Sequence, residues 1–230
     1  MKNDNYFIID FDSTFVQVES LDELAKIALR KRRDKNKILK KIENTTNLGM
    51  EGKILFRESL LIRLKLFSAN KNHIKELIKI LKRKITPSIL RNKKIFKINS
   101  NRIYIISGGF REYVFPVVKD FGIKGENVLT NSFIFDTKGN ITGFDKNNPL
   151  SKTNGKAKVI KKLNLNGKIN IIGDGYTDYQ VKEQKAADKF YAFVENIKRE
   201  SVISKADYIL ENFDKLISIL KANSASNPRG

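Results

Sequence analysis

The feature that most constrains the fold is a short apolar run that ends abruptly in two carboxylates. Residues 6–9 are a tyrosine, a phenylalanine and two isoleucines, and Asp10 and Asp12 follow at once. A continuous apolar run of this length predicts a strand that is buried on both faces. Carboxylates at the end of such a strand do not serve packing, because a buried charge requires water, a partner or a metal. The run therefore predicts a functional site at a strand end.

Two later stretches repeat this pattern of an apolar run followed by a polar cluster. Residues 102–106 lead into a serine and two glycines, and residues 169–172 lead into the sequence Gly-Asp-Gly. Helical patterns separate the three runs, which predicts an α/β fold with a parallel sheet and right-handed crossovers. Ligands bind beyond the carboxyl ends of the strands in such sheets, so the three clusters are expected to converge on one site.

The segment after the first strand is predicted to be a helical insertion. Ser20 and Glu23 form a capping-box pattern, which indicates the start of a helix. Residues 45–52 contain two glycines and are expected to break the helical pattern, and residues 54–66 predict another amphipathic helix. Pro87 begins the segment that leads back to the second strand.

These patterns divide the chain into a core, a cap and a tail. Residues 1–15 and 87–222 are predicted to form the α/β core, which includes a β-hairpin at residues 133–144. Residues 16–86 are predicted to form a small helical cap over the strand ends, where they would exclude water from the reaction. Residues 223–230 are small and polar, and we expect them to be disordered.

The residue counts exclude several kinds of site. The 230 residues include no cysteine and a single histidine, His73, so disulfides, zinc sites and a Ser-His-Asp triad are not expected. His73 falls in a polar helix start and is expected to be a surface residue. No apolar run approaches the ~20 residues of a membrane span, and we expect no signal peptide before the first strand. We therefore expect a cytoplasmic protein without membrane contact.

The converging acidic residues predict a Mg²⁺ site. This ion prefers octahedral oxygen ligands and often keeps water and substrate phosphate oxygens among them. The predicted ligands are the carboxylates of Asp10 and Asp174 and the main-chain carbonyl of Asp12. Asp178 is expected to support these ligands from behind.

The paired carboxylates of the first cluster suit phosphoryl transfer. Asp10 is predicted to attack phosphorus and form an aspartyl-phosphate. Asp12 is predicted to protonate the leaving oxygen and then to deprotonate the water that hydrolyses the intermediate. Ser107 and the N–H group of Gly108 would donate to the phosphate oxygens. A fixed cation is also needed, and Lys156 at a helix start is preferred over its neighbours at residues 152 and 158.

The motifs resemble those of the haloacid dehalogenase superfamily, and within it those of the phosphoserine phosphatases. The similarity rests on residues 10–14, residues 107–109, Lys156 and residues 173–178, and it extends to about residue 220. The resemblance implies a Rossmann-like three-layer core with a helical cap, and Mg²⁺-dependent aspartyl-phosphate chemistry. It further implies hydrolysis of L-phosphoserine to L-serine and phosphate in serine biosynthesis.

The resemblance also assigns residues to the substrate. Glu19 follows the first motif, and Met50, in a Met-Glu-Gly segment, is followed by Phe56 and Arg63 at the spacing of the family. In that family the glutamate meets the substrate ammonium and the arginine its carboxylate, which an arginine can hold through two hydrogen bonds. Thr177 stands in the last motif where many relatives have asparagine, and its oxygen is expected to face the metal or phosphate.

Other functions are kept as alternatives. The bulky Tyr176 replaces a residue that is usually small in the family, so the substrate could be another small metabolite phosphate, or an alcohol could accept the phosphoryl group. The net charge of +20 suggests instead a nucleic-acid-binding protein on a degenerate phosphatase scaffold. The densest basic run, residues 30–41, lacks interleaved aromatic residues, so no specific nucleic acid is expected. The predicted protein is a monomer or homodimer.

Overall fold

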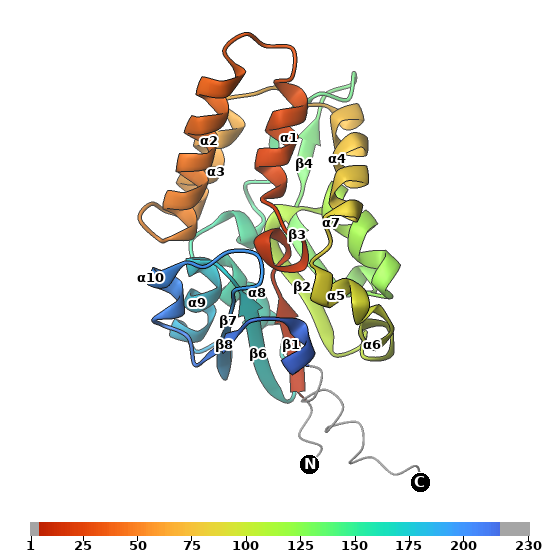
Figure 1. Cartoon of the computed structure of the whole chain (residues 1–230), viewed down its shortest axis with the longest axis vertical. Coiled ribbons are helices and arrows are strands. Elements are labelled where there is room, and N and C mark those ends of the chain that lie inside the picture. The colour runs from red at the N-terminus through yellow and green to blue at the C-terminus, as the bar shows by residue number, and fades with distance from the viewer. Residues whose placement is uncertain (1–4, 217–230) are drawn as a thin grey trace.

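The centre of the structure is a six-stranded parallel sheet. The computed structural model describes residues 5–216, and its strands follow the order β3-β2-β1-β6-β7-β8 (Figure 1). Ile9 at the end of β1 lies opposite Ile105 of β2 and Ile172 of β6, so the three predicted strands are neighbours. The strands are β1 (Asn5–Ile9), β2 (Ile103–Phe110), β3 (Val128–Asn131), β6 (Lys168–Gly173), β7 (Lys189–Phe193) and β8 (Tyr208–Leu210).

Helices cover both faces of this sheet, which confirms the three-layer α/β fold. Phe7 and Ile9 pack with residues of α5, α6 and α7 on one face, whereas Ile8 packs with residues of α8 and α9 on the other. This alternation along β1 follows from the two-residue period of a strand. The helices of these layers are α5 (Pro87–Arg91), α6 (Lys93–Ile98), α7 (Arg111–Val118), α8 (Gly155–Leu163), α9 (Tyr176–Glu183) and α10 (Glu200–Ile203).

Four further helices lie beyond the carboxyl ends of the strands (Figure 1). They are α1 (Ser20–Ala28), α2 (Lys35–Met50), α3 (Phe56–Leu64) and α4 (Lys71–Arg83). The predicted hairpin is present as β4 (Phe133–Phe135) and β5 (Ile141–Phe144), and a bridge between Asn70 and Asn140 joins it to the start of α4. Among the described helices, none is both long and apolar enough to cross a membrane.

The chain leaves the sheet for these four helices and returns at the same place. Val16 and Ile85 form an antiparallel bridge, and the N–H of Gln17 donates to the carbonyl of Lys84 at 2.8 Å. The N–H of Thr86 donates to the carbonyl of Phe15 at 3.1 Å. The two crossing segments are therefore paired as a short ribbon.

Several local predictions were wrong or fall outside the structure. Strand β3 was not predicted, because its sequence pairs two apolar with two polar residues. Helix α2 continues to Met50 through residues 45–49, which were expected to break it. Ser20 does not cap α1, because its N–H and hydroxyl donate to the carboxylate of Asp12 instead. Residues 217–220 of the expected last helix and the expected disordered tail, residues 223–230, lie outside the described residues.

Candidate active site

Asp10 follows β1 directly, and Asp12 lies on the tight turn, Phe11–Phe15, that comes next. The N–H of Asp10 continues the sheet by donating to the carbonyl of Ile172 at 2.9 Å. Ser13 adopts a left-handed backbone conformation with φ of 51°, which is uncommon for a residue other than glycine. Asn196 compensates for this conformation, since its side-chain amide donates to the carbonyl of Ser13 at 3.1 Å and to the Thr86 hydroxyl at 2.7 Å.

Three buried carboxylates, one after β1 and two after β6, meet beside this turn. Oxygen atoms of Asp10, Asp174 and Asp178 lie within 4.8 Å of one another. Burial raises the pKa of Asp178 to about 7, and it raises the pKa of Asp174 well above its usual value even though Arg199 opposes the shift. Such a crowded set of oxygen donors stabilises a divalent cation, and oxygen ligands suit Mg²⁺. The residues present therefore fit the predicted metal.

Lys156 is a buried cation in contact with two members of this cluster. Its ammonium nitrogen lies 2.9 Å from Oδ1 of Asp10 and 2.7 Å from Oδ1 of Asp178. Burial disfavours the charge on Lys156, but the two carboxylates outweigh burial and raise its pKa. The alternatives Lys152 and Lys158 have exposed side chains. Lys156 reaches the cluster because it lies in the first turn of α8, which begins next to the strand ends.

Asp12 has the properties of a proton donor at neutral pH. Burial, together with the nearby charge of Glu19, raises its pKa to about 8, although hydrogen bonds from Ser20 oppose the shift. The N–H of Ser20 donates to Oδ1 of Asp12 at 2.9 Å, and the Ser20 hydroxyl donates to the same oxygen. The first turn of α1 therefore fixes the orientation of this carboxyl group.

Glu19 and Arg63 lie at the other end of the site. Arg63 is only 5% exposed, and its Nη1 donates to the Thr46 hydroxyl at 3.1 Å and lies 3.4 Å from Oδ1 of Asp22. Glu19 accepts from the Ser13 hydroxyl at 2.8 Å. Burial raises its pKa, and the charge of Asp22 adds to the shift.

Arg199 was not predicted from the sequence. It is 7% exposed, its Nε donates to Oδ2 of Asp174 at 3.2 Å, and its Nη2 lies 3.5 Å from Oε1 of Glu19. Nothing local distinguished it among 45 basic residues. The available signal was topological, because the loop that carries Arg199 follows β7 at the same sheet edge as the three polar clusters.

A small inner cavity is lined by most of the predicted site residues. Its volume is about 30 Å³, which is room for roughly two water molecules. The predicted residues that line it are Asp10, Asp12, Glu19, Met50, Phe56, Arg63, Ser107, Gly108, Lys156 and Thr177, whereas Asp174 and Asp178 are not in its lining. Their assigned roles stay predictions.

The segment between α2 and α3 closes this cavity against the sheet. Phe56 touches Gly108 so closely that a Cβ atom on Gly108 would lie 2.3 Å from Cζ of the ring. Gly52, with φ of 76°, faces the ring of Tyr176, and a Cβ atom there would lie 2.5 Å from Cγ. Glycine is required at both close approaches.

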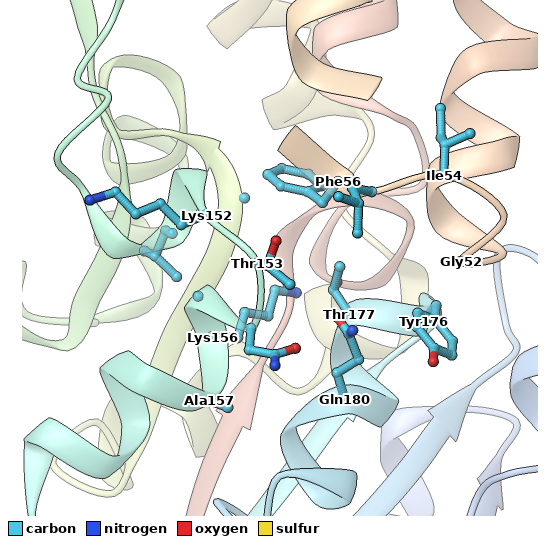
Figure 2. A pocket seen from close by; sticks show the side chains of 16 residues that line it. Gly52, Ile54, Phe56, Lys152, Thr153, Lys156, Ala157, Tyr176, Thr177 and Gln180 are labelled. Carbon is cyan, nitrogen blue, oxygen red and sulfur yellow. The ribbon is translucent and has the colours of Figure 1, made fainter. Parts of the chain in front are cut away.

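A second pocket opens next to the inner cavity, and we call it the outer pocket. It has a volume of about 60 Å³ and shares four lining residues with the inner cavity, namely Phe56, Gly108, Lys156 and Thr177. Figure 2 shows Phe56 above it, Thr153 and Lys156 on one side, and Thr177, Gln180 and Tyr176 on the other.

Comparison with known proteins agrees with this arrangement. Residues 7–183 match the family of haloacid dehalogenase-like hydrolases, so the chain belongs to this family. It is 33% identical to the chloroplastic phosphoserine phosphatase of Arabidopsis thaliana, over 92% of this chain and 70% of the relative. It is 32% identical to the phosphoserine phosphatase of Homo sapiens, over 92% of this chain and 91% of the relative.

Solved structures agree with these relatives. A phosphoserine phosphohydrolase-like protein from Francisella tularensis superposes with a TM-score of 0.84 at 36% identity, over 94% of this chain and 99% of the other. A phospho-aspartyl intermediate analogue of phosphoserine phosphatase shares the fold, with a TM-score of 0.74 at 24% identity, over 95% and 99% of the two chains. The chain is accordingly a phosphoric monoester hydrolase, similar to phosphoserine phosphatases.

Proposed function

We propose that this hydrolase is magnesium-dependent and converts L-phosphoserine to L-serine and phosphate. The observation that carries the substrate assignment is the charge balance at one end of the inner cavity. Glu19 and Arg63 line the cavity there, and each has an oppositely charged neighbour behind it, Arg199 for Glu19 and Asp22 for Arg63. This set complements an ammonium and a carboxylate together, which a phosphorylated amino acid carries.

The acidic cluster beside Asp10 is the proposed metal site. We propose that the carboxylates of Asp10 and Asp174 and the main-chain carbonyl of Asp12 hold Mg²⁺, with Asp178 behind them. When bound, the ion supplies positive charge that allows the phosphate dianion to approach the carboxylate of Asp10. The buried, crowded carboxylates described above support this assignment.

The first chemical step uses the carboxyl groups of Asp10 and Asp12. A carboxylate oxygen of Asp10 attacks phosphorus, the bond from phosphorus to the serine oxygen breaks, and the electron pair stays on that oxygen. Asp12 gives it a proton, which its pKa of about 8 makes available at neutral pH. Asp12, now ionised, then takes a proton from water as the water attacks phosphorus, and the carboxylate of Asp10 is released.

The phosphoryl group is held by groups at the strand ends. We propose that the Ser107 hydroxyl and the N–H of Gly108 donate to its oxygens, with Thr177 opposite. Lys156, which already contacts Asp10 at 2.9 Å, balances the charge that develops during transfer.

Helices α1–α4, within residues 16–86, act in this proposal as a cap that opens to admit substrate. The small inner cavity supports the need for opening, because it has room for only about two water molecules. The paired crossing segments at Val16 and Ile85 provide the hinge. We further propose that the enzyme works in the cytoplasm as a monomer or homodimer without a nucleic-acid partner.

Phosphate release from L-phosphoserine tests the proposal, beside a panel of other metabolite phosphates and with or without Mg²⁺. We expect a strong, metal-dependent preference for phosphoserine, and no turnover by Asp10→Asn. Turnover confined to another phosphate would reject the roles of Glu19 and Arg63. Release that requires an added alcohol would instead identify a phosphotransferase.

A further inference from the structure

The outer pocket meets the inner cavity at its phosphate end only. The four residues that line both include Gly108, Lys156 and Thr177, which surround the proposed phosphoryl site. Glu19 and Arg63 line the inner cavity and not the outer pocket. Phe56 stands between the two spaces and touches Gly108. The outer pocket therefore gives access to the phosphoryl group without access to the amino-acid end.

The lining of the outer pocket suits a small anion. Lys156 supplies positive charge at the inner end, and Lys152 lies at the rim with its side chain running outward (Figure 2). Among the described residues, none of those that line it is acidic. Hydroxyl and amide groups of Thr153 and Gln180 reach into the space, and both side chains can donate hydrogen bonds to an anion. The volume of about 60 Å³ holds several water molecules.

A rival opening at the Glu19 end of the inner cavity has the wrong charge for phosphate. It has a volume of about 280 Å³ and reaches the inner cavity at Glu19. Its lining holds four carboxylates and two basic groups, and one of the latter, Lys26, is already paired with Glu23 at 2.6 Å. The acidic members are Glu19, Asp22, Glu23 and Glu43. A phosphate dianion would be repelled along this path.

The order of the reaction makes a separate route useful. The alcohol product forms first, while the phosphoryl group is bonded to Asp10, so a water molecule must arrive next and inorganic phosphate must leave last. We propose that the outer pocket is the route for both, past Thr153 and Gln180, while the cap still covers the amino-acid end. This inference rests on the aspartyl-phosphate chemistry of the proposed function.

Oxygen exchange into inorganic phosphate measures this route directly. Bound phosphate is attacked by Asp10, one phosphorus–oxygen bond breaks, and that oxygen leaves as water with a proton from Asp12. Return of a solvent water places a solvent oxygen on phosphorus. With phosphate that carries four ¹⁸O atoms, mass spectrometry then reports how many exchanges occur before each release. This ratio of exchange to release does not depend on which step limits turnover.

Thr153→Trp narrows the route at an exposed position, and Gln180→Trp narrows it from the other wall. We expect each variant to raise the ratio of exchange to release by about threefold or more, because a narrowed route slows phosphate more than it slows water, the smaller molecule, and leaves the chemistry unchanged. Glu43→Trp adds the same bulk at the rival opening and should leave the ratio as it is in the unmodified enzyme.

Three outcomes overturn the proposal. An unchanged or lower ratio in both narrowing variants rejects the route and leaves the proposed function intact. An equal rise in Glu43→Trp also rejects it, because phosphate would then leave by either side. Absence of exchange in the unmodified, magnesium-loaded enzyme rejects the aspartyl-phosphate chemistry itself, and the route with it.

Discussion

Arg199 donates from Nε to Oδ2 of Asp174 at 3.2 Å, although 24 residues separate the two in the sequence and no motif links them. Both side chains are almost completely buried. The same guanidinium lies 3.5 Å from Glu19, so one residue connects the proposed metal site with the amino-acid end of the cavity.

Removal of this guanidinium should destabilise the metal-free protein. Arg199→Met removes the basic partner of the buried Asp174 and Glu19 carboxyl groups, and loss of one partner of a buried pair typically costs about 3–5 kcal/mol. Mg²⁺ should reduce this loss of unfolding free energy, because it supplies positive charge at Asp174. Urea unfolding with and without Mg²⁺ measures both values. Arg91→Met, which removes an exposed ion pair with Asp214, is the control and should change the free energy of unfolding little.

Replacement of Asp12 should affect substrates according to their leaving groups. In Asp12→Asn the donor that protonates serine is lost, and kcat for phosphoserine should fall by about 10²–10⁴-fold. An aryl phosphate with an acidic leaving group needs no proton, so its first step should be nearly unaffected and phosphoenzyme should accumulate. Rapid-quench detection of the phosphoenzyme checks this outcome. Equal loss of the first step on both substrates would contradict the proton-donor role.

Replacement of Arg63 should separate recognition from chemistry. Arg63→Ala removes charged hydrogen bonds that are worth about 1.5–3 kcal/mol, so kcat/KM for phosphoserine should fall about 10- to 150-fold. Hydrolysis of an aryl phosphate should change far less. Lys65→Ala, an exposed neighbour just after α3, is the matched control for charge. If kcat/KM falls equally for both substrates in Arg63→Ala, the guanidinium does not hold the substrate carboxylate.

A methyl group on Gly108 should interfere with Phe56. In Gly108→Ala the new Cβ lies 2.3 Å from Cζ of Phe56, so the ring must move and the cavity cannot close as it does now. Overpacking of this kind costs about 1–3 kcal/mol, and we expect a similar penalty in kcat/KM. Gly143→Ala meets no atom within 4 Å and should behave as the unmodified enzyme does. Steady-state kinetics on phosphoserine compares the two.

The metal-free protein should become less stable as the pH rises from about 4 to about 8. Burial raises the pKa of Asp12 from 3.8 to about 8 and that of Asp178 to about 7, so the folded state binds more protons than the unfolded state across this window. The stabilisation is complete below the unfolded pKa and is lost as the pH passes the folded pKa.

Urea unfolding in EDTA across this pH range measures the slope of the free energy of unfolding against pH. Mg²⁺ should flatten it, because the ion favours the ionised carboxylates. Asp12→Asn should also flatten it, since an amide does not titrate. A slope of the opposite sign in the metal-free protein would show that these groups are already ionised in the folded state.

Prediction from sequence succeeded where a pattern is local. The apolar runs that became β1, β2 and β6 are continuous, and carboxyl ends of parallel strands must share an edge, so the meeting of Asp10 with Asp174 followed from topology. The hairpin at residues 133–144 could also be predicted, because two short apolar stretches flank a glycine-containing turn.

Prediction failed where a partner is distant in sequence. Ser20 has the local pattern of a helix cap, yet its own N–H and hydroxyl donate to the carboxylate of Asp12, which precedes the helix by several residues. Strand β3 forms through pairing with β2, and its own residues have no strong periodicity. Asn196 and Arg199 act through contacts with the turn after β1 and with Asp174, which no spacing along the chain encodes.

The bridge between Val16 and Ile85 has an evolutionary consequence. Because the chain departs from the sheet and rejoins it at paired positions, the helices between them form an insertion that is attached to the sheet at one place. Their number, length and lining can change by insertion or exchange while the turn that bears Asp10 and Asp12 keeps its place. Selection can therefore alter which molecule is accepted without having to rebuild the machinery that breaks its phosphate bond.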